Sequence, residues 1–214
     1  MLRLLQWGDA MTRTLPAAAV VATLSALSGL PAAAACPAEA GDALRGIVVM
    51  LEDGTRVDMR RDAATGIVSE TWDNPADPPP YREDLIEGVH LILSQDLDAA
   101  GQPVPGAFTR FRFIDGPLPA LAEGASWSGE VEVQYGDGNV EATYAFSVGA
   151  ARGIEVGGCA YQALPVTTTM REPDYAWASQ IDHIPLLGVG LLRGHGEVMG
   201  DTTVYVAVSI AVAE

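Results

Sequence analysis

The sequence contains no lysine, so all 12 of its basic residues are arginine. This absence excludes a Walker-type phosphate loop, a Schiff-base enzyme and an S-x-x-K serine hydrolase, because each of them needs a lysine amine. Basic residues are also few beside 28 acidic ones, and the formal net charge is −16. Nucleic acids and anionic lipid surfaces both require a basic footprint, so the charge balance argues against both partners.

Long apolar runs are equally scarce, with one exception near the N-terminus. Leu15–Leu30 is uncharged and apolar, Arg3 and Arg13 precede it, and small residues follow it as far as Ala35. This pattern is typical of a secretory signal peptide. We expect residues 1–35 to be removed and the remainder to be exported, to the periplasm or outside the cell.

Two aspects of this leader stay open. Translation could begin at Met1 or at Met11, since the segment after Met11 is by itself a suitable basic start. The leader could also be retained as an N-terminal anchor, although its apolar run is shorter than the roughly 20 residues that cross a bilayer.

Only two cysteines occur, Cys36 and Cys159. An even count in an oxidising compartment predicts a disulfide between them. The alternative is lipidation of Cys36, which would anchor the protein to a membrane. Ala33–Ala35 supply the small residues that a lipoprotein site needs, but the leucine that usually stands three places before the cysteine is missing. Two free thiols are the third possibility.

Hydrophobic residues alternate with polar ones over much of the remaining chain, and this period of two predicts β-strands. The clearest case is residues 130–148, which we expect to form a hairpin around a four-residue loop, Gly136–Asn139. A symmetric loop would place Tyr135 opposite Val140 and Val133 opposite Ala142. One face of the hairpin would then be buried.

Other segments follow the same alternation, whereas helical patterns are short. Expected strands are Ile47–Leu51, Arg56–Arg60 (Val57 and Met59 inward), a strand with Val89, Leu91 and Leu93 on one face, Thr109–Phe113 (Phe111 and Phe113 inward), and Thr203–Val212 with Val204, Val206, Val208, Ile210 and Val212 on one face. Expected helical turns are Ala38–Leu44, Arg82–Ile86 and a 3₁₀ segment at Pro117–Glu123. Residues 36–214 are therefore predicted to form a single all-β domain, an antiparallel sandwich or a curved half-barrel or barrel with few short helices.

The polar residues predict no metal site and no cofactor. The three histidines, His90, His183 and His195, lack the close spacing of zinc ligands. Asp96–Gly101 begins like a calcium loop, but Ala107 stands where the bidentate glutamate belongs.

No catalytic residue is predicted either. Gly124–Ser128 lacks the second glycine of a G-x-S-x-G elbow. Asp182 and His183 could orient a nucleophile only if a serine came near them. Pairs of carboxylates occur by chance in so acidic a chain.

Aromatic residues are the remaining signal. They could line an apolar pocket within a curved sheet, because small β-barrels and half-barrels often bind ligands in their mouths. The alternative is ordinary packing in the core. The candidate pocket residues are Trp72, Trp127, Tyr144, Phe146 and Trp177.

Several segments of the C-terminal half resemble bacterial periplasmic β-rich proteins of uncharacterised function, near the lipoprotein-carrier half-barrels. The residues that carry the resemblance are Gly124–Gly129 (GASWSG) with the hairpin that continues to Val148, Gly157–Tyr161 with Pro165–Val166, and Ile184–Gly188 (IPLLG). The resemblance implies a curved antiparallel sheet and a role in the cell envelope. It transfers no functional residue.

These observations favour an exported envelope protein without catalysis, which binds an apolar small molecule or an envelope protein on its curved sheet. One alternative is a structural or assembly factor that acts through an exposed strand edge. Another is a carboxylate-using hydrolase on a β scaffold, which requires two carboxylates in one cleft with raised pKa values.

Overall fold

The computed structural model describes residues 35–213, so the predicted signal segment lies outside the described residues except for Ala35. One short helix, α1 (Ala40–Arg45), comes first. The strands are β1 (Ile47–Leu51), β2 (Arg56–Arg61), β3 (Ile67–Asp73), β4 (Tyr81–Ile86), β5 (His90–Leu97), β6 (Pro103–Phe113), β7 (Ser126–Tyr135), β8 (Gly138–Val148), β9 (Arg152–Val156), β10 (Cys159–Arg171), β11 (Ala176–Ile184), β12 (Val189–Glu197), β13 (Thr202–Val204) and β14 (Ala207–Val212). The predicted all-β class is confirmed.

The strands form one antiparallel sheet that is not closed. Strands β1 to β8 follow one another as a meander, β8 pairs with β10, and β10 to β13 continue to one end of the sheet. The first part of β10 pairs with β9 instead, from Cys159 to Ala163. The opposite end is β14, which pairs with β1.

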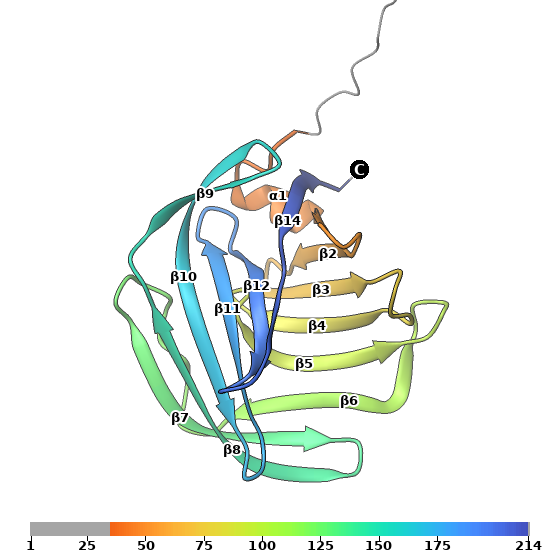
Figure 1. The fold of residues 1–214 in the computed structure, drawn as a ribbon, viewed down its shortest axis with the longest axis vertical. Helices are drawn as coiled ribbons and strands as arrows, with labels where there is room; N and C mark the ends of the chain where they lie inside the picture. The colour runs from red at the N-terminus through yellow and green to blue at the C-terminus, as the bar shows by residue number, and fades with distance from the viewer. Residues whose placement is uncertain (1–34, 214) are drawn as a thin grey trace, which may run out of the picture. The chain divides into compact units, whose positions relative to one another are not determined.

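The sheet folds over itself, so that its two halves face each other. In Figure 1, β2 to β6 run across the view, whereas β10 to β12 run nearly upright, and β7 and β8 lead from one set to the other. Strands that cross at a steep angle are typical of orthogonal packing. Two apolar clusters fill the interior: one is built around β1 to β3 with parts of β10, β12 and β14, and the other around β6 to β8 with β10 and β11.

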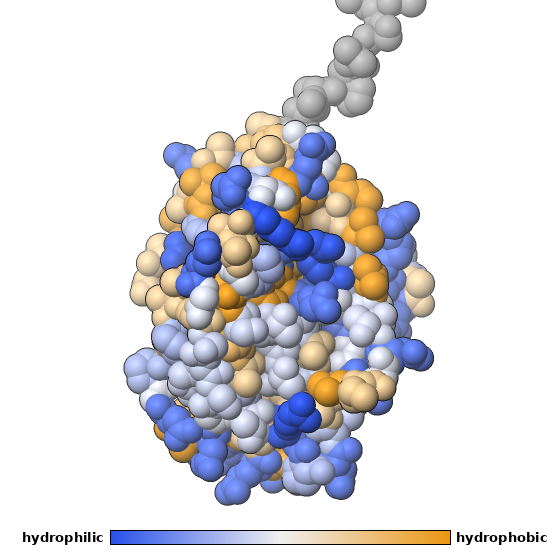
Figure 2. Space-filling view, turned by 60° about the vertical axis from the view of Figure 1, so that its left-hand side comes forward, coloured by the Kyte–Doolittle hydropathy of each residue, from blue (hydrophilic) through white to orange (hydrophobic). Residues whose placement is uncertain are grey.

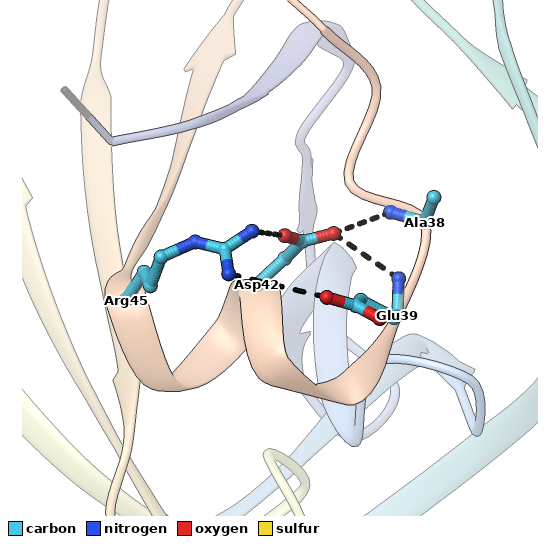
Figure 3. Close-up of polar contacts among 4 residues, drawn as sticks. All are labelled: Ala38, Glu39, Asp42 and Arg45. Carbon is cyan, nitrogen blue, oxygen red and sulfur yellow. Dashed lines mark hydrogen bonds and ion pairs between the residues drawn. The ribbon is translucent and has the colours of Figure 1, made fainter.

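The predicted disulfide joins the start of the described chain to β10. Cys36 and Cys159, whose sequence separation is 123, are bonded with their Cα atoms 5.6 Å apart. Next to it, Oδ2 of the buried Asp42 accepts hydrogen bonds from the backbone N–H groups of Ala38 and Glu39, at 2.6 and 3.1 Å, and Arg45 pairs with Oδ1 (Figure 3). These contacts fix the first turn of α1, which confirms the helix expected at Ala38–Leu44.

The predicted hairpin at residues 130–148 is present, but its register differs from the expected one. Tyr135 pairs with Gly138 and Val133 with Val140, so the turn holds two residues instead of four. A shift of two positions leaves every side chain on its expected face, because the period of a strand is two. Val131, Val133, Ala142 and Tyr144 are accordingly buried.

Two helical expectations were wrong. Arg82–Ile86 lies in β4, paired on both sides, because the neighbouring strands β3 and β5 offer a complete ladder of backbone partners. Pro117–Glu123 contains no helix and forms an irregular connection before β7.

A bulge in β5 overturns the expected common face of Val89, Leu91 and Leu93. Leu85 pairs with Leu91, whereas Asp84 pairs with Leu93, so Ile92 is the extra residue. Leu93 consequently points to the outer face, beside Asp84 and Arg110. Ser94 takes the next inward position.

The strand expected at Thr203–Val212 is two strands at opposite ends of the sheet. Residues 205 and 206 cross between them: the N–H of Tyr205 donates to the carbonyl of Arg193, and the N–H of Glu52 donates to the carbonyl of Val206. The crossing breaks the alternation, so Val204, Val206 and Val208 are exposed instead of buried, and only the later part of the aliphatic face, at Ile210, reaches the core.

The surface seen in Figure 2 mixes charged and polar groups with separate apolar patches, without one broad apolar area. Among the described residues, no helix is long and apolar enough to span a membrane.

Candidate ligand cavity

A cavity of about 350 Å³ lies between the two halves of the folded sheet. Inward residues of β3 to β8 and of β10 to β12 form its wall, together with Tyr205 from the crossing segment. Most of the lining is apolar or aromatic, and it includes Leu85, Val89, Leu91, Phe111, Met170, Ile181 and Leu192.

The structure brings three of the five predicted pocket residues to this cavity. Trp72, Tyr144 and Trp177 line it, whereas Trp127 and Phe146 do not. Trp127 and Phe146 are register partners farther along the β7–β8 hairpin. Phe146 packs against His90, with ring centroids 4.8 Å apart, and Trp127 packs edge-on against Phe113. The cavity therefore ends at Tyr144, and the next aromatic pair belongs to the core.

Two directly opposed carboxylates in the cavity wall are the feature that sequence reasoning missed. Glu70 and Glu83 are directly opposed on β3 and β4, and both line the cavity. Burial raises the pKa of Glu83 to about 7. Burial, and secondarily the charge of Glu83, hold the pKa of Glu70 well above its usual range.

Three aromatic rings line the cavity together with these carboxylates. Trp72 and Tyr81 are also opposed on β3 and β4, and their rings stack at 5.9 Å with an interplanar angle of 5°. The ring of Tyr205 meets Trp72 edge-on at 5.8 Å. The indole Nε1–H of Trp72 donates to Oε2 of Glu70 at 3.2 Å. We call Glu70, Glu83, Trp72, Tyr81 and Tyr205 the acidic cage.

The cavity wall carries further polar groups that are not part of the acidic cage. Ser179 Oγ lies at hydrogen-bond distance, 3.0 Å, from Nδ1 of His195, whose ring packs against Trp177. The hydroxyl of Tyr135 donates to Oε1 of Glu172 at 2.6 Å. Burial lowers the pKa of His195, so this imidazole is neutral at pH 7.

The histidine pairing considered from the sequence is not formed. The carboxylate of Asp182 accepts from Arg152 at 2.7 Å and from Arg193 at 2.9 Å, so it is committed to two guanidinium groups and does not orient His183. The serine that contacts a histidine is Ser179, and its partner is His195.

His90 supports the cavity wall from behind. Its Nδ1 lies 2.7 Å from the hydroxyl of Tyr144, which lines the cavity. Burial, helped by the nearby His183, lowers the pKa of His90 to about 4, so the ring is neutral at pH 7. Among the described residues, no cluster of three or more metal-ligating side chains occurs.

One signal in the sequence could have revealed Glu70. Residues 67–73 alternate, and Glu70 stands between Val68 and Trp72 on the face that the structure buries. A glutamate in the middle of an apolar face is unusual, because burial of a carboxylate is costly without a partner. Glu83 gave no such signal, since its strand was mistaken for a helix.

Comparisons with known proteins found no matching family model and no matching curated protein. Among solved structures, the hypothetical lipoprotein YmcC from Escherichia coli is similar at 11% sequence identity, over 77% of this chain and 83% of that one, with a TM-score of 0.37. A TM-score of this size does not establish a shared fold, so the function must be argued from the cavity itself.

Proposed function

We propose that this chain is an exported protein of the cell envelope that binds an apolar or amphiphilic small molecule between the two halves of its sheet, without catalysing a reaction. The cavity carries the proposal. Its volume, about 350 Å³, and its largely apolar wall suit a small-molecule site. Export is supported by the Cys36–Cys159 disulfide, because such bonds persist in oxidising compartments.

A titration of the purified mature chain with the neutral fluorescent probe N-phenyl-1-naphthylamine tests the proposal. Ser94 lies between Glu83 and Thr109 on neighbouring strands and points into the cavity. Ser94→Phe should fill the space and weaken probe binding by about tenfold or more. Ser94→Ala is the matched control and should bind like the parent chain.

Circular dichroism and urea denaturation establish that the Ser94→Phe variant is folded. Saturable binding that the phenylalanine leaves unchanged would place the probe elsewhere and contradict the proposal. Failure of the parent chain to bind any apolar probe would contradict it directly.

The opposed glutamates favour a second candidate, a carboxylate-using hydrolase. General acid–base chemistry needs one protonated and one ionised carboxyl group, and the raised pKa values of Glu70 and Glu83 suit that division near neutral pH. Hydrolysis of a panel of 4-nitrophenyl glycosides tests it. Turnover should be lost in both Glu70→Gln and Glu83→Gln and kept in Glu141→Gln, whose side chain is exposed. No turnover by the parent chain, or turnover that survives both changes, speaks against this candidate.

A further inference from the structure

Asp42, Asp182 and Glu70 are buried acids, Glu83 is partly buried, and the four fall into two classes. Asp182 forms an ion pair with Arg193, and Asp42 forms one with Arg45. Glu70 and Glu83 have none among the described residues. Glu70 is 4% exposed, its Oε2 accepts from Trp72, and no hydrogen bond from residues 35–213 reaches its Oε1.

Glu83 has even fewer polar partners than Glu70. Among residues 35–213, its carboxylate has no hydrogen bond and no ion pair, although it lines the cavity beside Glu70. No arginine lines the cavity within the described chain. Arg82, the next residue along β4, pairs with Asp84 instead, and neither of these two lines the cavity.

Such an arrangement is unfavourable by itself. When both are ionised, like charges that are directly opposed on neighbouring strands repel each other, and a carboxylate that is buried or partly buried without a counterion loses part of its hydration. The titratable groups near Glu83 among the described residues are Glu70, Tyr81 and Tyr205, and none of them carries a positive charge. The cage therefore lacks a cation that its geometry could accommodate.

The aromatic rings indicate what kind of cation would fit. A hydrated metal ion prefers several oxygen ligands, and no metal-ligating cluster is present among the described residues. Ammonium groups, in contrast, are bound by aromatic faces together with carboxylates. Trp72, Tyr81 and Tyr205 supply three rings in the same cavity wall as the two glutamates, and the Trp72–Tyr81 stack covers one face of each of those two rings.

We infer that the ligand of this cavity carries an ammonium group, which lies in the acidic cage, while its apolar part contacts the aliphatic and aromatic wall. This inference rests on the proposed function and names the chemical class of its ligand. The ammonium supplies the positive charge that Glu70 and Glu83 lack. The wall beyond the cage, which includes Leu91, Phe111 and Met170, covers the apolar part.

Three ligands with the same alkyl chain distinguish a purely apolar site from one that also binds an ammonium group. They are octyltrimethylammonium, 1-octanol and octanoate, each used below its micelle concentration. Calorimetric titration of the full mature chain at pH 8 should give a dissociation constant for the ammonium about tenfold or more below that for octanol, the advantage that one desolvated cation–aromatic contact supplies. Octanoate should bind more weakly than octanol.

Variants test whether the acidic cage is responsible for the tighter binding of the ammonium. Glu70→Gln combined with Glu83→Gln should remove the advantage of the ammonium over octanol, and circular dichroism with urea denaturation shows that the variant is folded. Tyr205→Leu removes one ring without a change of charge and should reduce the advantage in part. Glu141→Gln removes one carboxylate at an exposed site and should have no effect.

The pH dependence is a further readout. The ammonium advantage should grow as pH rises from 5.5 to 8.5, because ionised carboxylates bind the cation and the pKa of Glu83 is about 7. If octanol binds and the ammonium binds no more tightly, the inference is overturned and the apolar site survives. If neither binds, both proposals are overturned.

Discussion

Glu83 occupies a position that the surrounding side chains make unfavourable for charge. Its carboxyl group faces a second glutamate across the β3–β4 pair, and burial raises its pKa from about 4.5 to about 7. The folded state therefore holds this proton more tightly than the unfolded state does. Between these two pH values, the unfolded chain loses the proton first, so the contribution of Glu83 to stability falls as pH rises.

Replacement of Glu83 by glutamine removes this penalty. Glu83→Gln should raise the free energy of unfolding at pH 8 by about 1–3 kcal/mol and leave it nearly unchanged at pH 4, where the parent carboxyl group is already neutral. Urea denaturation at several pH values measures the difference. Glu141→Gln, the exposed control, should follow the parent at every pH, and an equal gain in both variants would contradict the assignment to Glu83.

His90 affects stability in the opposite direction. Its folded-state pKa of about 4 lies below the ordinary value of 6.5, so the unfolded chain binds a proton first as pH falls. Its contribution to stability is complete above pH 6.5 and is lost as pH decreases towards 4. When Glu83→Gln is compared with the parent chain at the same pH, the contribution of His90 to the free energy of unfolding cancels, because His90 is present in both.

The turn between β4 and β5 contacts the start of β12 at the level of backbone atoms. Gly88, between β4 and β5, lies against Gly190 at the start of β12, and a Cβ atom on Gly190 would overlap the carbonyl oxygen of Gly88. The same Cβ would lie 2.8 Å from Cγ2 of Ile181. This contact joins the two halves of the sheet next to the cavity, whose lining includes both glycines.

Gly190→Ala should therefore separate these two segments and destabilise the protein by about 1–3 kcal/mol, which is typical of overpacking at a well-filled site. Thermal or urea denaturation measures the loss. Gly138→Ala is the control, because a Cβ at Gly138 has no heavy atom within 4 Å. Equal free energies of unfolding for the two variants would show that the backbone around Gly190 can move to accept a Cβ atom without loss of stability.

At the scale of elements, the sequence predicted strand identity better than strand geometry. Alternation identified residues 130–148 as a hairpin, and its buried face was correct, because hydrophobic burial acts on every second residue whatever the length of the turn. The number of turn residues was not encoded in that alternation. The bulge at Ile92 was also invisible, since it depends on pairing with β4 and not on the composition of β5.

The disulfide acts on the whole molecule. It joins Cys36 to Cys159 across 123 positions, so it restricts the unfolded chain over most of its length. Replacement of both cysteines by serine should lower the free energy of unfolding by about 2–5 kcal/mol. Urea denaturation of the variant measures this loss, and treatment of the parent chain with reductant should reproduce it.

Intact mass spectrometry checks the same bond chemically. Reduction of the disulfide adds two hydrogens, about 2 Da, whereas acylation of Cys36 would add several hundred Da, on the order of a few fatty chains. A mature chain that carries such a mass and releases no hydrogens on reduction would contradict the disulfide.

The sequence by itself determined the all-β class, the cysteine pair and the buried faces of the clearest strands, because these follow from local alternation and composition. Only the tertiary structure decided that Tyr205 would leave its strand and complete a cage with Glu70 and Glu83. Those three residues are distant in the sequence, and their proximity depends on how one sheet folds over itself. The physical reason is that burial along a strand is a local property, whereas the meeting of two sheet halves is set by strand order, bulges and the crossing segment together.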